Sequence, residues 1–211
     1  MVSIRHIESA DLVPGPGRRP SGDDEVPHAL LDAARESILA VGWRRTTLTD
    51  VARRAGVSRM TIYRRWPDMQ SLLADLLVRE WEAVLRTTPL AEDATVTPAV
   101  LAEGVVTVVA ALREEPLLRR IIDVDPELLL PYLLTRRGRN QDRVLELLAA
   151  GVRRGQESGA VRDGDPVLIA RSVVLAAHGF VLSAPTMTGD GVEPAALDAE
   201  LRHLVEGHLA R

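Results

Sequence analysis

The fold is decided by the stretch from Thr46 to Trp66, TTLTDVARRAGVSRMTIYRRW. Thr47 is followed three residues later by Asp50, the Ser/Thr-x-x-acid pattern that caps the start of a helix. Gly56 is a natural end for this first helix, and Ser58 is a favourable cap for a second helix that runs to the end of the stretch. The sequence therefore predicts two short helices joined by a tight turn.

The second of these helices has two different sides. Ile62 and Trp66 stand four residues apart and form an apolar stripe, and Val57 supplies an apolar plug in the turn before them. Pro67 stops the helix, because its ring disfavours a helical conformation at the preceding residue. The polar and basic side chains remain on the other side, where they are available to the major groove of DNA. These residues are Arg59, Thr61, Tyr63, Arg64 and Arg65.

The charge of the chain is unevenly distributed. The formal net charge of the 211 residues is −4 at pH 7, whereas residues 43–66 hold seven arginines and one acid, Asp50. This segment therefore carries +6 and the rest of the chain −10. A basic patch on an acidic protein is typical of a site for a polyanion. A solvated helix face would carry the same charges, so charge alone leaves both interpretations open.

The rest of the chain predicts an all-α fold. Residues 1–24 are rich in Pro and Gly and predict a flexible arm, whose Arg18 and Arg19 either enter a DNA minor groove or belong to a leader without a function. Apolar residues recur at helical spacing from Pro27 to Val41, and no stretch shows the alternation of a strand. Further helices are predicted at 68–86, 98–114, 116–123, 126–136, 140–157, 166–184 and 194–210. The predicted domains are a three-helix helix-turn-helix domain at 25–70 and a larger helical domain at 71–211.

The stretch Thr46–Trp66 resembles the DNA-binding segment of the TetR/AcrR repressors. The resemblance covers about residues 27–75 and is carried by the Ala-Gly-Val-Ser turn, by the Tyr three residues before a large aromatic, and by the Leu-Leu that follows. It implies a bacterial transcriptional regulator and not an enzyme. In this family the usual form is a homodimeric repressor that binds palindromic double-stranded operator DNA and is released when a small molecule binds its C-terminal domain.

The resemblance also implies roles for single residues. Thr47 and Tyr63 correspond to contacts with the DNA backbone, and the positions that read bases or nearby phosphates lie on the second helix. The complete set of implied DNA-binding residues is Thr47, Ser58, Arg59, Thr61, Tyr63, Arg64 and Arg65. Two positions depart from the family pattern. Trp66 replaces a common Phe, and Met69 replaces a Lys that contacts phosphate, so we expect Arg65 or Arg44 to compensate.

The resemblance implies that the C-terminal domain, residues 71–211, senses an effector and dimerises. We expect a hydrophobic or amphipathic small ligand, because the candidate pocket residues are largely apolar. They are Trp81, Leu85, Leu101, Val105, Val108, Ile121 and Leu128, with Tyr132 and His178 as polar groups. The dimer-interface candidates form stripes on the last two helices: Ile169, Ser172, Val173, Ala176, Phe180, Leu197, Leu201, Leu204, Val205 and His208. Ordinary core packing is the alternative for both sets, and for the pocket candidates it is the favoured role.

A helical enzyme is the alternative class. Glu200 and His203 have the Glu-x-x-His spacing of di-metal carboxylate sites, but such sites need a second copy, which the chain lacks. The absence of cysteine excludes disulfides, zinc-thiolate sites and thiol nucleophiles. We therefore expect no catalytic residue, metal or cofactor. No apolar run has the length of a membrane span, and residues 1–24 contain no hydrophobic signal core, so we expect a cytoplasmic protein.

Overall fold

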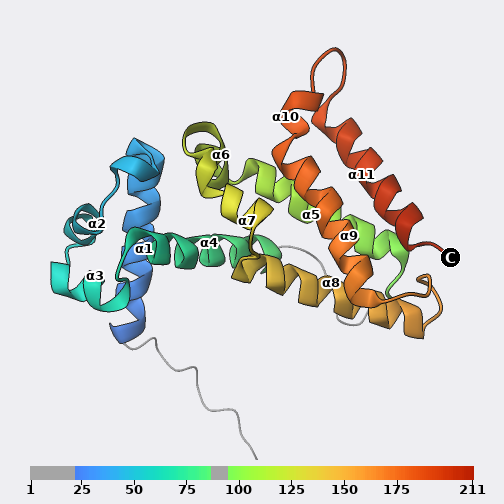
Figure 1. Cartoon of the computed structure of the whole chain (residues 1–211), viewed down its shortest axis with the longest axis horizontal. Coiled ribbons are helices and arrows are strands. Elements are labelled where there is room, and N and C mark those ends of the chain that lie inside the picture. Colours follow the sequence, from blue (N-terminus) through green and yellow to red (C-terminus); the bar gives the residue numbers. More distant parts are fainter. Residues whose placement is uncertain (1–21, 87–94) are drawn as a thin grey trace, which may run out of the picture.

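The computed structural model describes residues 22–86 and 95–211, and the regular elements in these ranges are helices (Figure 1). This confirms the predicted all-α class. The elements are α1 (Gly22–Val41), η1 (Trp43–Arg45), α2 (Leu48–Arg54), α3 (Arg59–Arg65), α4 (Met69–Arg86), α5 (Pro98–Glu114), α6 (Pro116–Val124), η2 (Pro126–Leu128), α7 (Leu130–Leu134), α8 (Arg139–Glu157), α9 (Pro166–Leu182), α10 (Ala184–Met187) and α11 (Pro194–Leu209).

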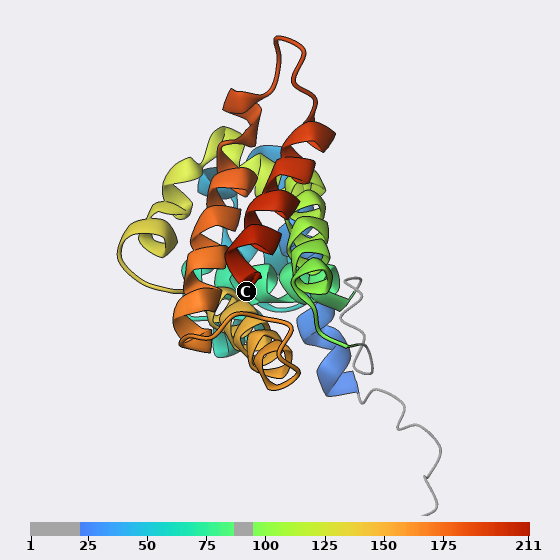
Figure 2. The same ribbon diagram turned by 90° about the vertical axis from the view of Figure 1, so that its right-hand side faces the viewer.

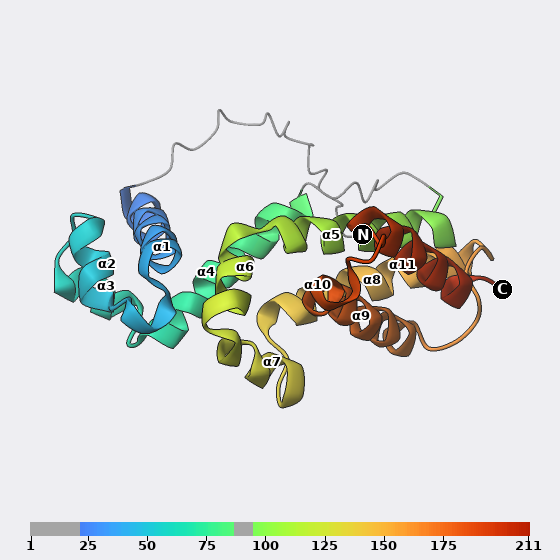
Figure 3. The same cartoon turned by 90° about the horizontal axis from the view of Figure 1, so that it is seen from above.

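The helices enclose two apolar cores. The first joins α1, α2, α3 and the start of α4, and it also receives Leu117 and Ile121 from α6. The second joins α5, α8, α9 and α11. The helix α4 runs from the first group toward the second, so α1 to α3 lie at one end of the molecule and α9 and α11 at the other (Figures 1 and 3). The contribution of α6 to the first core means that this core extends beyond the first three helices.

Local signals placed most helix starts correctly. Pro98, Pro116, Pro166 and Pro194 each stand at the beginning of a helix, as predicted. Proline suits the first turn, because the backbone N–H that it lacks has no partner there in any case. The first helix is an exception, since α1 begins at Gly22 and contains Pro27 within it. Pro27 is therefore the sixth residue of α1, beyond its first turn, and the helix continues on both sides of it.

Two predicted helices are shorter than expected. The predicted segment 126–136 divides into η2 and α7, which are separated at Leu129, and Pro131 lies in the first turn of α7, where its missing N–H needs no helical partner. The predicted segment 166–184 ends at Leu182 and is followed by the separate short helix α10, which contains Pro185. Arg18 and Arg19 of the predicted arm lie outside the described residues. Within residues 22–86 and 95–211, no helix combines the length and apolar character needed to cross a bilayer.

Candidate DNA-binding surface and effector cavity

The first helix of the basic segment is held by a reciprocal cap at Thr47. The hydroxyl oxygen of Thr47 accepts a hydrogen bond from the backbone N–H of Asp50 at 3.1 Å and donates one to the Asp50 carboxylate at 2.6 Å. Gly56 follows α2 with a φ of 69°, a left-handed conformation that favours glycine. The tight turn predicted between the two helices therefore has both its cap and its glycine in place.

A capping residue, two buried side chains and a hydrogen bond to α4 hold the second helix, α3, in place. The Ser58 hydroxyl accepts a hydrogen bond from the Thr61 N–H at 3.2 Å and lies 2.9 Å from the Thr61 hydroxyl. Ile62 and Trp66 are buried in the first core. The indole Nε1–H of Trp66 donates to the carboxylate of Asp75 on α4 at 2.8 Å. These contacts fix the axial position and rotation of α3, so the side chains on its other face point outward.

The outward face of α3 is basic and largely free of internal partners. Tyr63 is 48% exposed, and Arg59 and Arg64 are exposed with no acidic partner in the described part of the chain. The arginines of α2 differ, because Arg53 pairs with Asp50 and Arg54 pairs with Glu36. The implied DNA-binding set lies on one end of the molecule; Thr47, Ser58, Arg59, Tyr63, Arg64 and Arg65 are exposed and Thr61 is half-buried.

Arg44, one of the two arginines expected to compensate for Met69, is engaged by an acidic side chain. Met69 is half-buried and packs against the first core. The Arg44 guanidinium donates to the Glu127 carboxylate from Nε at 2.9 Å and from Nη2 at 2.5 Å. These hydrogen bonds raise the pKa of Arg44 and lower that of Glu127. Arg65, whose guanidinium lies 5.9 Å from the centre of the Trp66 ring, remains as the candidate.

A cavity of about 920 Å³ lies among α4, α5, α7, α8 and α9. Gly151 on α8 permits the helices around it to approach closely, since a Cβ there would lie 2.7 Å from Cδ2 of Leu101. Ile121 does not line the cavity and belongs to the first core instead. The other pocket candidates all lie on the cavity wall: Trp81, Leu85, Leu101, Val105, Val108, Leu128, Tyr132 and His178.

The largely apolar wall of the cavity includes a neutral polar group. The side-chain amide of Gln141 donates to the Tyr132 carbonyl oxygen at 3.1 Å and lies 3.4 Å from Nε2 of His178. Burial lowers the pKa of His178, which favours a neutral imidazole at this site. Such a wall can bind an apolar body and orient it with a few hydrogen bonds. Among the described residues, no group of three or more His, Asp or Glu side chains is arranged to hold a metal ion.

Sequence comparison gives the family. Residues 30–76 match the description "Bacterial regulatory proteins, tetR family". An uncharacterised HTH-type transcriptional regulator of Mycobacterium bovis is 38% identical over 180 residues, which cover 85% of this chain and 92% of that protein. The chain belongs to the TetR family. It is therefore a bacterial transcriptional regulator with a DNA-binding helix-turn-helix, as the sequence resemblance implied.

Solved structures of this family share the fold. The TetR-family repressor QsdR of R. erythropolis has a TM-score of 0.62 at 20% identity and covers 89% of this chain and 97% of its own. The regulator FadR of Bacillus subtilis, solved with stearoyl-CoA, has a TM-score of 0.64 at 19% identity and covers 86% of this chain and 98% of its own. At these sequence identities, both similarities show a shared fold and nothing more specific.

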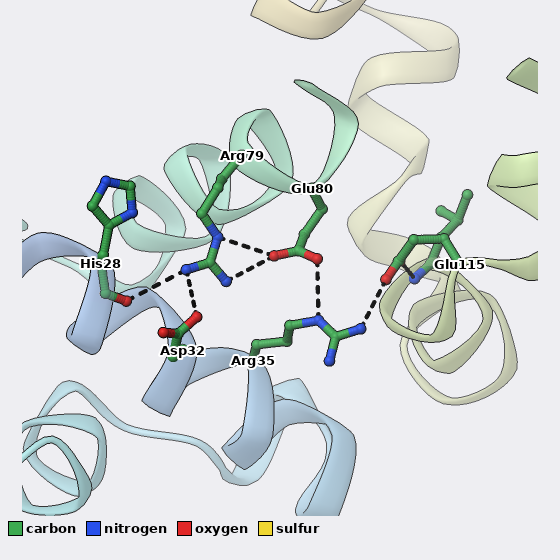
Figure 4. A network of polar contacts seen from close by, with 7 residues as sticks. His28, Asp32, Arg35, Arg79, Glu80 and Glu115 are labelled. Carbon is green, nitrogen blue, oxygen red and sulfur yellow. Dashed lines mark hydrogen bonds and ion pairs between the residues drawn. The ribbon is translucent and has the colours of Figure 1, made fainter. Parts of the chain in front are cut away.

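In this TetR-family protein a polar network joins the helix-turn-helix end to the cavity-bearing helices (Figure 4). Arg35 on α1 donates to Glu80 on α4 at 3.1 Å and to Glu115, between α5 and α6, at 3.3 Å. The Arg79 guanidinium on α4 also donates hydrogen bonds to the Glu80 carboxylate at 2.7 Å and to the Asp32 carboxylate on α1 at 2.7 Å. The second oxygen of Glu115 caps α6 by accepting the Leu118 N–H.

A second polar contact connects the same two parts of the protein. The carboxylate of Asp125, which is 1% exposed, accepts the backbone N–H of Trp43 at 2.9 Å and lies 3.6 Å from Nε of Arg44. Asp125 stands between α6 and η2, and Trp43 begins η1 just before α2. Sequence reasoning missed Asp125, Arg35 and Glu115, because their partners lie about 80 residues away and no local pattern marks them.

The interface candidates divide between the inside and the outside of the subunit. Ile169, Val173, Leu201 and Val205 are buried in the second core, which corrects their assignment to a dimer surface. Phe180, Ser172 and Leu197 are half-buried, whereas Ala176, Leu204 and His208 are exposed. The outer sides of α9 and α11 also expose Leu168, at 65%, and Leu175, at 71%. These helices lie side by side at the end opposite the helix-turn-helix (Figure 2).

Proposed function

We propose that this TetR-family protein is a ligand-responsive repressor that binds a palindromic operator as a homodimer in the bacterial cytoplasm. In this proposal residues 25–70 belong to the DNA-binding domain, and residues 71–211 bind the effector and dimerise. The observation that carries the proposal is the free basic face of α3. Arg59 and Arg64 project from a helix whose opposite side is fixed by Ile62 and Trp66.

DNA selection tests the operator part of this proposal. Sequences retained by the protein from a random DNA pool should contain two inverted half-sites. Their centres should be about 34–36 Å apart, because a two-fold dimer places its recognition helices on successive major grooves. Binding should weaken as salt increases, since the arginines displace counterions from phosphates. Recovery of no enriched motif at low salt would refute operator recognition.

Arg64→Ala is expected to weaken operator binding by about 5- to 150-fold, because an arginine that hydrogen-bonds a guanine contributes about 1–3 kcal/mol of discrimination. Fluorescence anisotropy with the selected operator measures this change. If Arg64 reads a base, the loss is larger for the operator than for unrelated DNA. Arg119→Ala is the matched control, since Arg119 is an exposed arginine on α6 that pairs with Glu114. Equal effects of the two substitutions would contradict the role of Arg64.

The exposed apolar sides of α9 and α11 support the dimer part of the proposal. Leu175→Arg is expected to produce a monomer at micromolar concentration, because it places a charge in a desolvated interface. Sedimentation velocity measures the change. Leu134→Arg is the control, since Leu134 on α7 is 75% exposed and lies on a different element. A native protein that sediments as a monomer, or a Leu175→Arg variant that remains dimeric, would exclude this interface.

The effector part of the proposal rests on the cavity. Its size and its apolar wall with few polar groups are typical of small-molecule sites. Operator release then requires that the ligand bind one arrangement of the helix-turn-helix more tightly than the other. The Arg35 network and the Asp125 contact provide physical connections between the cavity-bearing helices and α1 or η1. A compound that fills the cavity without changing operator affinity would not be the effector.

A further inference from the structure

We infer that the cavity binds an elongated amphiphile whose aliphatic tail lies between α5 and α8 and whose anionic head lies at Arg136. This inference rests on the proposed effector role of the cavity and specifies the chemical class of the ligand. Its basis is the distribution of charged groups around the opening, where the segment that joins α7 to α8 meets solvent. The helix α7 stands out from the bundle beside the start of α8 (Figure 3).

The inner wall of the cavity suits a tail. Val105 and Val108 of α5 face the cavity together with Leu147 of α8 and Val174 of α9, and none of these side chains carries a polar atom. Removing an aliphatic chain from water into such a wall is favourable in proportion to the apolar area buried. The Gln141–His178 pair interrupts this wall with neutral groups, because burial holds the pKa of His178 low.

The acidic groups at the opening are already engaged by the protein. The Asp68 carboxylate accepts the backbone N–H and the hydroxyl of Ser71, at 2.7 and 2.8 Å. The Glu127 carboxylate accepts two hydrogen bonds from Arg44. Arg44 therefore balances the charge of Glu127, whereas Asp68 keeps its charge and is held at the start of α4 by Ser71.

The arginines that line the cavity differ from one another. Arg154 lies near the C-terminal end of α8, whereas the other three stand at or just before its start. Arg137 pairs with Asp142 at 2.8 Å, and Arg139 pairs with Asp75. Arg136 is exposed and lines the cavity, and its guanidinium lies 5.1 Å from the centre of the Tyr132 ring. Within residues 22–86 and 95–211 it has no carboxylate partner. A carboxylate or phosphate at this position would complete a charge-assisted hydrogen bond that the protein leaves open.

The experiment compares ligands that share one aliphatic tail and differ in their head groups. Dodecanoate, dodecanoyl-CoA and dodecanol are titrated below their micellar concentrations into the native protein, and binding is measured by calorimetry and by the fluorescence of Trp81, which lines the cavity. At least one anionic ligand should bind about ten- to a hundredfold more tightly than the alcohol. Which of the two anionic ligands binds more tightly shows whether the site prefers a free carboxylate or a phosphate-bearing thioester. Shortening the tail should weaken binding about fourfold per methylene group.

Two arginine substitutions test where the anionic head group of the ligand binds. Arg136→Gln should abolish the preference for the anionic ligand and leave dodecanol binding unchanged. Arg143→Gln should retain the preference, because Arg143 is an exposed arginine of α8 that pairs with Glu146 and does not line the cavity. Equal binding of acid and alcohol by the native protein, or a preference that survives Arg136→Gln, would overturn the inference.

A separate operator titration without ligand distinguishes the two proposals. Operator binding together with no binding of any amphiphile would overturn the ligand class and leave the regulator proposal standing. Absence of operator binding would refute the proposed function, whereas the head-group preference would still be decided by calorimetry.

Discussion

Trp66→Ala is expected to lower the free energy of unfolding by about 3–5 kcal/mol, which is the usual cost of deleting a large buried aromatic side chain. Trp66 is 2% exposed and closes α3 against α4. Its loss leaves a cavity beneath the recognition helix and removes the indole hydrogen bond to Asp75. We therefore expect operator binding to fail as well, because the rotation of α3 depends on this anchor. Chemical denaturation at one fixed protein concentration measures the change in stability.

Trp66→Phe separates packing from hydrogen bonding. The phenyl ring fills most of the space of the indole. The free energy of unfolding should therefore fall by only about 1 kcal/mol, which is the contribution of the indole N–H hydrogen bond. Burial tends to raise the pKa of Asp75, but hydrogen bonds from Arg139 and Trp66 outweigh burial and lower it. A lowered pKa stabilises the fold above the ordinary carboxyl pKa, and this contribution is lost as the pH falls through the folded-state pKa. The cost of Trp66→Phe should therefore shrink in acid. An alanine variant as stable as the phenylalanine variant would contradict the packing role.

The helix-turn-helix was predictable because its signals are local. The caps at Thr47 and Ser58 and the glycine at 56 each act within four residues, and the structure contains all three. Proline positions fixed four later helix starts for the same reason. Proline failed as a guide at Pro27, because α1 begins five residues before it, and the first turn of α7 at Pro131 was not recognised as a separate helix start.

The interior and exterior faces of α9 were not predictable from spacing. This helix is apolar around most of its circumference, so Ile169 and Val173 cannot be distinguished by pattern from Leu168 and Leu175. Packing against α5 and α8 places the first pair inside and leaves the second pair exposed. The opening of the cavity escaped prediction for a related reason. The partners of Arg139 and Glu127 lie more than 60 residues away, and only the tertiary fold shows which arginine remains available.

Asp125→Ala is expected to lower the free energy of unfolding by about 2–3 kcal/mol, because it leaves the part-buried Trp43 N–H without its acceptor. The Asp125 carboxylate is nearly inaccessible to solvent, so water cannot replace it without a local rearrangement. Asp125→Asn keeps an oxygen that can accept the same hydrogen bond and should cost clearly less. Asp123→Ala is the matched control, since Asp123 is an exposed aspartate two residues earlier and should change stability by less than about 0.5 kcal/mol.

The same variants test whether Asp125 positions the helix-turn-helix. The carboxylate joins the end of α6 to the residue that begins η1, and η2 on its other side leads to cavity-lining residues such as Leu128 and Tyr132. If this contact orients α2 and α3 relative to α4, Asp125→Ala should weaken operator binding under conditions where the protein remains folded, and Asp125→Asn should largely restore it. Operator affinity measured by anisotropy that is unchanged in Asp125→Ala would assign the contact to stability alone. The Arg35 network would then be the polar connection from α1 to test next.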